Sequence, residues 1–597
     1  MSLAQLQAAA RLLQQGQPAQ AEAQLDQLLS GSPEDVEALH LRGLARGRLG
    51  KTGEALMDLQ AAARRHGQPH AVLSNLGNLK RRTGDLEGAV AAYEAALEKQ
   101  PDFLDARVNL GIALTDLRRF DEAALAFEAV IARQPGHTAA LNGLGIVRHH
   151  QGDEEGALTA YSEAIEQNPK TVMSRINRGA IFRGRNEIQA SLADIDEACR
   201  PAPRLAEAHF QRGHTLRTLG QTGAAREAYQ QAVACAPQRA DIHRDLAGLL
   251  WEMGEAEKST SVLDQVLSRQ PTAELHHTRA RVLMRTGWPE AALDAAGAAL
   301  ALDASHAEAK ALRGEILAKL GDPAAAIGDI RDALALRGGD DFAIRHQLAE
   351  ACLAAGRFDE AEQALDAVPP PEHLQKHVAL QATVWRCLGD DRYKRLYDYD
   401  LLTAKRFIET PPGFSSLEAF NAELAARIEQ LHSTRAQPIE QTLFGGTQSP
   451  GRLWDVDDPV IQALGEALLD MASRFVDELP NDPEHPFLAR KSSALKLTGA
   501  WSVRLASGGG HVDHIHPAGW ISASYYVQVP KAVIEGERAG WLRLGVPGVA
   551  GLELDAERYI CPEAGAAILF PSYMWHGVEP FQSDDVRVTA PFDLLPV

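Results

Sequence analysis

The sequence predicts a multidomain protein in which an all-α solenoid precedes an all-β domain. A unit of 34 residues repeats through about the first 370 residues. From about residue 495 the pattern changes to short apolar runs separated by Gly and Pro, which is typical of a β-sandwich or barrel. With 597 residues, the chain is also too long for a single hydrophobic core.

Three kinds of residue mark the 34-residue period. A glycine recurs at one position of each unit, at Gly43, Gly77, Gly111, Gly145, Gly179 and Gly213. An aromatic residue follows 16 residues later in four of these units, at Tyr93, Phe127, Tyr161 and Tyr229. A proline closes six units, at Pro101, Pro135, Pro169, Pro203, Pro237 and Pro271. We expect the glycine to let two helices approach closely, the ring to fill the gap between repeats, and the proline to end the second helix.

This period and residue pattern resemble the tetratricopeptide repeat. We count about eleven units, of which the first and last are degenerate. No single unit can bury its own apolar face, so the units are expected to stack into a superhelix with a concave groove. We therefore assign residues 1–370 to a repeat solenoid.

The rest of the chain divides at about residue 490. Residues 371–490 carry helical pieces such as SLEAFNAELAARIEQLHS, and we interpret them as a helical linker that leads into the last domain. Residues 491–597 hold the apolar runs LKLTGAWSVRL, WISASYYVQV, GWLRLGV, AAILFP and VRVTAPFDLL. We expect each run to form a strand of an all-β core.

Histidines gather within this predicted β core, in the string HVDHIHP and at His576 before a later strand. Residues i and i+2 of a strand point to the same side, so His514 and His516 can hold one ion together. The overlapping pair His511 and Asp513 can do the same. With His576 as a third ligand, either pair would form a three-point face with open positions. That arrangement is used by non-haem Fe(II) oxygenases.

Four motifs follow one another here: H-x-H-P at 514–517, SxxYYV at 522–527, FPSxxxH at 570–576, and Arg587. In this order they resemble the bacterial and phage branch of the 2-oxoglutarate/Fe(II)-dependent dioxygenase superfamily. The resemblance covers roughly residues 490–597. It implies a double-stranded β-helix, or jelly roll, accompanied by some helices. It also implies Fe(II), 2-oxoglutarate and O2 as cofactors, with ascorbate added in vitro.

The resemblance also implies roles for the histidines. It favours His514, His516 and His576 as metal ligands, because the relatives carry HxHP at this distance before SxxYYV. The pair His511 and Asp513 stays open as the alternative. If His514 and His516 bind the metal, we expect Asp513 to orient one of the ligand histidines.

Arg587 lies 11 residues after His576. The superfamily uses an arginine here to bind the distal carboxylate of 2-oxoglutarate, and a planar guanidinium suits that two-pronged contact. Thr589 lies two residues further on. It is expected to share the face of Arg587 and to add a hydroxyl to the cosubstrate site.

Carboxamides recur two residues before the repeat glycine, at Asn75, Asn109, Asn177 and Gln211. This position is expected to face the concave groove, where a carboxamide can both donate to and accept from a peptide backbone. A similar asparagine ladder is found in the repeats of the O-linked N-acetylglucosamine transferase family. The alternative is that these side chains bond between repeats and cap helices.

The bulk properties limit the partners and the compartment. The net charge of −20 argues against nucleic acid and against an anionic membrane surface, since both attract basic proteins. No apolar run reaches the length of a membrane span, and the N-terminus shows no signal peptide. Five scattered cysteines without a CxxC indicate reduced thiols. We therefore expect a cytoplasmic protein.

Together these patterns predict a 2-oxoglutarate- and Fe(II)-dependent dioxygenase that hydroxylates a protein or peptide held by the repeats. Two alternatives stay open. One is a non-catalytic repeat scaffold with a degenerate oxygenase domain. The other is a small-molecule oxygenase whose repeats mediate assembly.

Overall fold

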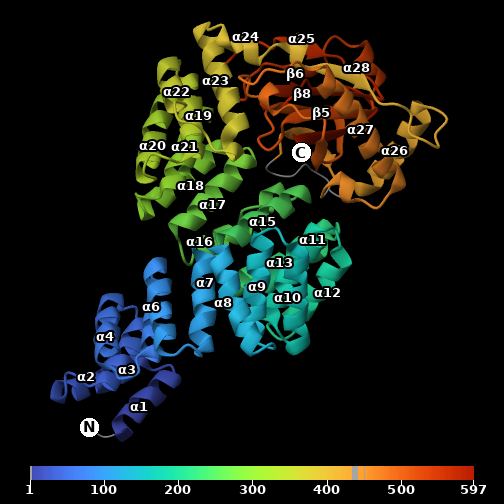
Figure 1. Ribbon diagram of the computed structural model, residues 1–597. Coiled ribbons are helices and arrows are strands. Elements are labelled where there is room, and N and C mark those ends of the chain that lie inside the picture. Colours follow the sequence, from blue (N-terminus) through green and yellow to red (C-terminus); the bar gives the residue numbers. More distant parts are fainter. Residues whose placement is uncertain (1–2, 433–440, 450) are drawn as a thin grey trace. The chain divides into compact units, whose positions relative to one another are not determined.

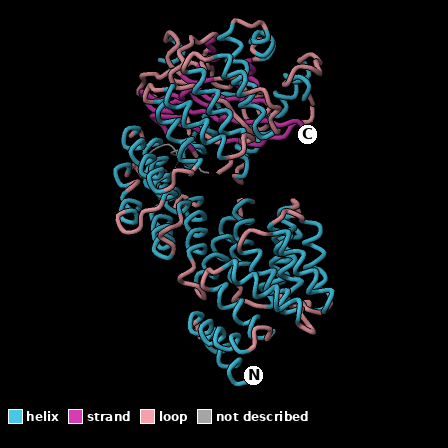
Figure 2. Tube along the Cα trace, turned by 90° about the vertical axis from the view of Figure 1, so that its left-hand side faces the viewer, coloured by secondary structure: helices cyan, strands magenta, loops and turns pink. Residues whose placement is uncertain are grey.

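The computed structural model describes residues 3–432, 441–449 and 451–597. The chain divides into two compact units, Met1–Pro203 and Arg204–Val597. The described part of the first unit is helical, and all described strands lie in the second unit (Figure 1, Figure 2). The predicted fold class, an all-α solenoid followed by an antiparallel β domain with some helices, is confirmed.

Six successive helix pairs form the first unit. The pairs are α1 (Leu3–Gln14) with α2 (Pro18–Gly31), α3 (Val36–Arg48) with α4 (Thr52–Arg65), α5 (His70–Arg82) with α6 (Leu86–Lys99), α7 (Leu104–Asp116) with α8 (Phe120–Arg133), α9 (Thr138–His150) with α10 (Glu154–Gln167), and α11 (Val172–Gly184) with α12 (Ile188–Cys199). Aspartate caps several of these helices. The Asp85 and Asp153 carboxylates each accept a backbone N–H from the first turn, which satisfies a donor that the helix leaves unpaired.

The repeat glycine is required by an aromatic ring of the same unit. A Cβ on Gly77 would lie 2.6 Å from the ring of Tyr93, and one on Gly111 would lie 2.7 Å from Phe127. Phe127 is approached from the next unit as well, since a Cβ on Gly143 would lie 2.4 Å from its ring. The ring therefore packs against the glycine of its own unit and, at Phe127, also fills the gap to the next repeat.

The second unit begins with five more helix pairs. They are α13 (Ala206–Thr218) with α14 (Thr222–Cys235), α15 (Ala240–Glu252) with η1 (Ala256–Lys258) and α16 (Ser261–Leu267), α17 (Ala273–Arg285) with α18 (Pro289–Leu302), α19 (Ala307–Lys319) with α20 (Pro323–Leu336), and α21 (Phe342–Ala354) with α22 (Phe358–Ala364). Residues 3–364, all of which the structure describes, thus hold eleven such pairs. A further helix, α23 (Leu374–Leu388), packs against α21 and α22.

Shorter elements lead from the repeats into the β domain and accompany it. They are η2 (Pro371–His373), α24 (Arg392–Leu396), α25 (Tyr399–Leu402), α26 (Leu417–Leu431), η3 (Leu453–Asp455), α27 (Pro459–Glu478), η4 (Leu488–Arg490) and α28 (Lys531–Glu535). Ser416 and Asp458 cap α26 and α27, and Pro459 begins α27 at the position where a helix tolerates proline. Among the described residues, no helix has both the length and the apolar character needed to cross a membrane.

Ten strands of the described chain form one antiparallel sheet in the order β1-β8-β5-β10-β4-β9-β6-β7, with β2 beside β4 and β3 beside β10. The strands are β1 (Ala404–Phe407), β2 (Leu443–Gln448), β3 (Leu495–Ala500), β4 (Val503–His514), β5 (Ile521–Gln528), β6 (Leu542–Leu544), β7 (Arg558–Ile560), β8 (Ala566–Pro571), β9 (His576–Val578) and β10 (Arg587–Pro596). All five predicted runs form strands. The domain limits at 370 and 490 stay predictions, and β1 and β2 come from the segment between them.

One hydrophobic core joins the last repeats to the sheet. It includes Ile330 of α20, Val384 of α23, Leu468 of α27 and Phe592 of β10, all of which are buried. Helix α26 packs on β5, and α27 packs on β1 and β3. The end of the repeat array and the β domain therefore share one core and should be stabilised together.

Candidate functional site

The candidate site lies where β4 ends beside β9. His514 is the last residue of β4, and it pairs across the ladder with His576, the first residue of β9. His516 lies two residues beyond the strand, and its backbone N–H donates to the Ser572 carbonyl at 3.0 Å. The two histidines of the HIH string are thus brought together by a strand end and the turn after it, rather than by one continuous strand.

His514, His516 and His576 form a compact cluster. One ring nitrogen from each can be chosen so that all three lie within 4.8 Å of one another. The ring centres are 4.2 Å apart for His514 and His576, and 5.0 Å apart for His516 and His576. Three imidazoles this close can bind one transition-metal ion.

Hydrogen bonds fix the protonation of all three rings. Nδ1 of His514 lies 2.8 Å from the Val512 carbonyl oxygen, and Nδ1 of His576 lies 2.9 Å from that of Met574. Nδ1 of His516 lies 2.6 Å from the Asp593 carboxylate. Because these oxygens only accept, each Nδ1 carries the proton and each Nε2 offers a lone pair.

Burial and the neighbouring imidazoles favour the neutral form of two of these rings, His514 and His576. They lower the pKa of His514 to about 3 and hold the pKa of His576 well below its ordinary value. A metal ligand must be unprotonated at the coordinating nitrogen, so the electrostatics of the cluster and its hydrogen bonds favour the same state.

Asp513 does not orient a ligand histidine, contrary to the sequence-based expectation. Its two carboxylate oxygens accept from Arg543 at 2.6 and 2.9 Å, and Arg543 also binds Glu579 at 2.8 Å. The physical reason is strand alternation, which turns Asp513 away from the side of its neighbour His514. The arginine holds this carboxylate in an ion pair, away from the histidine cluster.

Asp593 takes the orienting role instead, and sequence reasoning missed it. Its Oδ1 binds His516 Nδ1 and also accepts from the Ser522 hydroxyl at 2.7 Å. Asp593 lies six residues after Arg587 on β10, an even spacing that places both on one face of the strand. That spacing is the signal that could have identified it.

His511, the other member of the alternative pair, lies near the cluster without joining it. Its ring centre is 6.0 Å from that of His514. The group of described residues able to converge on one ion here contains His514, His516 and His576. His511 instead places its Nδ1 3.4 Å from the Thr442 hydroxyl.

Arg587 is a buried cation whose guanidinium has no acidic partner within the described part of the chain. Its side chain is 2% exposed. Nη1 donates to the Gly540 carbonyl at 2.6 Å, Nε is buried without a hydrogen-bond acceptor, and the Tyr526 ring centre lies 4.9 Å from the guanidinium carbon. Burial lowers the pKa of this group, but a guanidinium stays charged. A buried unpaired charge is costly, so this site fits an anionic ligand.

One cavity of about 380 Å³ contains the predicted site residues. Its walls include the three clustered histidines, His511, Arg587, Thr589 and Asp593, together with Leu443, Trp501 and Phe570. A metal bound by the histidines and a carboxylate bound by Arg587 would therefore occupy the same cavity. The donor set and the orphaned guanidinium nitrogen both fit an Fe(II) and 2-oxoglutarate site.

A second group able to converge on an ion, Glu274, His277 and His306, lies among the repeats. It fits a metal poorly. Nδ1 of His306 accepts the Ala309 backbone N–H at 3.2 Å, as a helix cap, and Nε2 lies 3.2 Å from Glu274. The proton of the neutral ring therefore sits on Nε2, the atom that would have to coordinate.

The groove candidates differ among themselves. Asn75 Nδ2 lies 2.9 Å from a ring nitrogen of His40, and Asn177 donates to Asn142 at 3.2 Å, so both bond to a neighbouring repeat. Gln211 donates to Glu207 one turn earlier at 2.8 Å. Within the described residues, Asn109 makes no side-chain hydrogen bond, and it lines a hollow of about 340 Å³ together with Asn75.

Comparison with known families identifies two kinds of module. Residues 499–593 match a family described as "Putative 2OG-Fe(II) oxygenase". Two tetratricopeptide repeat families match the helical region, one over 6–72, 74–127, 110–171 and 277–341, the other over 216–282 and 317–383. The chain therefore carries tetratricopeptide repeats and a 2OG-Fe(II) oxygenase domain, as the resemblance predicted. This family implies Fe(II) and 2-oxoglutarate as cofactors.

No curated protein matches the chain. Among solved structures, yeast Tom70 is 15% identical, over 67% of this chain and 97% of that one, with a TM-score of 0.39. A tetratricopeptide repeat protein from Parabacteroides merdae is 20% identical, over 47% of this chain and 97% of that one, with a TM-score of 0.31. At these scores the repeat assignment rests on the family matches.

Proposed function

We propose that this chain is a 2-oxoglutarate- and Fe(II)-dependent dioxygenase that hydroxylates a protein or peptide recruited by its repeats. One observation carries the proposal. A single cavity joins three clustered histidines, which suit a transition metal, to a buried guanidinium without an acidic partner among the described residues, which suits a carboxylate.

In this proposal His514, His516 and His576 hold Fe(II), and Asp593 keeps His516 in the ligating tautomer. Arg587 binds the distal carboxylate of 2-oxoglutarate and Thr589 adds a hydroxyl. When bound, Fe(II) and 2-oxoglutarate would activate O2: the cosubstrate would give up two electrons as it loses CO2 and becomes succinate, and O2 would be the oxidant of the substrate C–H bond. Three imidazole ligands would bring no negative charge into the coordination sphere itself, so the ion would attract a dicarboxylate more strongly than an ion with a carboxylate ligand would.

The repeats are proposed to recruit the substrate. Tetratricopeptide arrays present an extended concave surface, and we expect that surface to carry the carboxamides Asn75, Asn109, Asn177 and Gln211. A carboxamide can pair with a peptide backbone whatever its sequence, so we propose a protein or peptide as the partner.

Succinate release from 2-oxoglutarate, with Fe(II) and ascorbate, tests the activity. We expect basal release from the full chain, stimulated by a true substrate peptide, and no release from His576→Ala. Co(II) binding to the metal-free protein tests the centre separately. We expect about one Co(II) per chain, lost in His576→Ala with unchanged helical circular dichroism. Co(II) binding without succinate release would favour the scaffold alternative.

A further inference from the structure

Trp575 immediately precedes His576 and connects it to the repeat array. We propose that Trp575 is a positioning residue, through which helix α23 sets the placement of His576 and hence the metal affinity of the site. This inference rests on the proposed metal centre. It means that metal binding would depend on Trp575 and α23, both of which lie outside the histidine cluster.

His576 needs support from outside its own strand. Strand β9 contains only three residues, His576–Val578. The Nδ1 bond of His576 goes to Met574, two residues earlier in the same turn. The backbone of His576 is paired with His514 of β4 and Leu544 of β6, but the hydrogen bond that orients its ring depends on the turn 572–575.

That turn is anchored on both sides of Met574. The Tyr573 hydroxyl donates to the Leu396 carbonyl at 2.7 Å, and the Tyr573 carbonyl accepts from the Tyr397 hydroxyl at 3.2 Å. The Trp575 backbone N–H lies 3.2 Å from the same Tyr397 hydroxyl, and its carbonyl accepts from Gly545 at 2.9 Å. These contacts fix the backbone that leads into His576.

The indole of Trp575 makes the contact with α23. It is 3% exposed, and its Nε1 donates to the Thr383 hydroxyl at 3.0 Å and lies 3.4 Å from the Ala379 carbonyl. Lys376 lies on the same helix, three residues before Ala379. Its Nζ is 4.8 Å from the centre of the Trp575 ring. Lys376 is also paired with Glu350 of α21. Figure 1 shows α23 beside the strands of this domain.

A group that orients a metal ligand commonly changes metal affinity when it is lost. A residue that only fills the core would change stability instead. Two substitutions that break this contact, and one that keeps it, separate these roles. Trp575→Phe keeps an aromatic ring and removes the indole N–H. Thr383→Val removes the hydroxyl that receives it, whereas Thr383→Ser retains that hydroxyl.

Trp385 offers a matched control on the same helix. Its Nε1 donates to Glu362 at 3.1 Å, away from the histidine cluster. Trp385→Phe therefore also removes one indole hydrogen bond of α23, but it leaves the contact between α23 and the turn 572–575 intact.

Co(II) titration of the metal-free full-length chain is the test, read by the visible d–d absorption and accompanied by thermal melts. We expect Trp575→Phe and Thr383→Val each to raise the Co(II) dissociation constant about tenfold and to alter the d–d spectrum. Thr383→Ser and Trp385→Phe should bind Co(II) as the wild type does.

The inference is overturned if Trp575→Phe and Thr383→Val bind Co(II) as the wild type does, with or without a lower melting temperature. Should Trp575→Phe not fold, the comparison of Thr383→Val with Thr383→Ser decides. A wild type that binds no Co(II) overturns the proposed metal centre and this inference together, whereas normal wild-type binding with unaffected variants overturns this inference alone.

Discussion

At the scale of single residues, the tautomers of the three clustered histidines are set by oxygens that accept hydrogen bonds. Two backbone carbonyls and one carboxylate hold the Nδ1 protons of the three histidines. Only the carboxylate, Asp593, can be changed by substitution. Substitution of Asp593 should therefore show how strongly metal affinity depends on the tautomer of His516.

Asp593→Asn removes the charge that binds the His516 ring and is expected to weaken Co(II) binding on the order of 10–100-fold. Asp513→Asn is the matched control, since the Asp513 carboxylate binds Arg543 rather than a ligand ring. It should leave Co(II) affinity unchanged. The opposite ranking would move the centre to His511 and Asp513.

Arg587→Lys keeps a positive charge but cannot form a two-pronged contact with a carboxylate. Losing one charge-assisted hydrogen bond costs roughly 1.5–3 kcal/mol, so the apparent 2-oxoglutarate constant should rise on the order of 10–150-fold while Co(II) still binds. Succinate release at varied 2-oxoglutarate measures this. Arg543→Lys, which alters the pair with Asp513, should leave the constant unchanged. Ordinary 2-oxoglutarate dependence in Arg587→Lys would refute the assigned role.

At the scale of the element, close helix packing and hydrogen bonds between repeats both stabilise the array. Each repeat glycine admits a ring or an aliphatic side chain of the paired helix. Asn75 and Asn177 each bond to the preceding repeat. The two kinds of contact predict different responses to substitution.

Gly145→Ala would place a Cβ 2.4 Å from the ring of Tyr161, which is 2% exposed and cannot move into solvent without opening the core. Such overpacking costs about 1–3 kcal/mol. Gly53→Ala is the control, because no atom lies within 4 Å of the new Cβ, and a helical alanine gains about 0.5–1 kcal/mol over glycine. Urea unfolding followed by helical circular dichroism should show these opposite shifts.

Substitution of the carboxamides can separate an effect on peptide binding from an effect on the stability of the repeat array. Asn177→Ala breaks a bond between repeats and should cost about 0.5–1.5 kcal/mol of stability. Asn109→Ala breaks no such bond and should leave the melting temperature unchanged while weakening the binding of a substrate peptide. Thermal melts and peptide affinity, measured on both variants, test this. If Asn109→Ala binds the peptide normally, the partner lies on another face.

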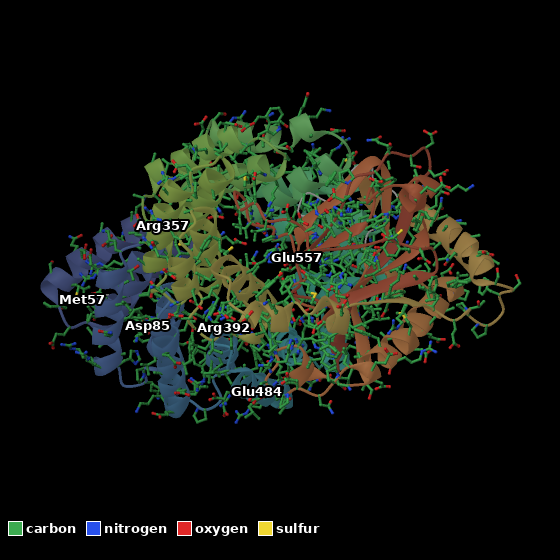
Figure 3. All side chains as sticks on the ribbon, turned by 90° about the horizontal axis from the view of Figure 1, so that it is seen from above. Met57, Asp85, Arg357, Arg392, Glu484 and Glu557 are labelled. Carbon is green, nitrogen blue, oxygen red and sulfur yellow. The ribbon has the colours of Figure 1, made fainter. Side chains whose placement is uncertain are left out.

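At the scale of the second unit, the oxygenase domain and the end of the repeats behave as one body. Besides the shared core, Arg386 of α23 donates to the Gly545 and Asp555 carbonyls. Glu557, labelled in Figure 3, accepts from the hydroxyls of Tyr393 and Tyr399. We therefore propose that the folding unit of the oxygenase extends back to α23.

A fragment limited to 491–597 lacks β1, β2, α23, α26 and α27, which supply much of the core around the sheet. It is expected to be unfolded, whereas 204–597 should fold and bind Co(II). Near-ultraviolet circular dichroism and Co(II) titration of the two fragments check this. A folded, metal-binding 491–597 fragment would contradict the proposal.

Periodicity and motif order allowed much of this protein to be predicted from its sequence. The 34-residue period predicts the helix pairs, since each glycine and its ring are neighbours in one unit. The apolar runs predict β3, β4, β5, β6, β8 and β10. By contrast β1, β7 and β9 have four residues or fewer, and β2 (LFGGTQ) contains two glycines, which weaken the strand pattern, so their pairing depends on the strands around them.

The sequence by itself determined the two modules, and it supplied the residues of the proposed metal site and the arginine of the proposed cosubstrate site, because these are carried by the repeat period and by short motifs in a fixed order. Only the tertiary structure decided which carboxylate serves the histidines. Asp513 and Asp593 are the same residue type, and the sequence does not show which of them binds a histidine. In the folded chain, Arg543 of β6 binds Asp513, whereas Asp593 of β10 lies beside His516. Such choices depend on which distant strands become neighbours, and spacing along the chain does not contain that information.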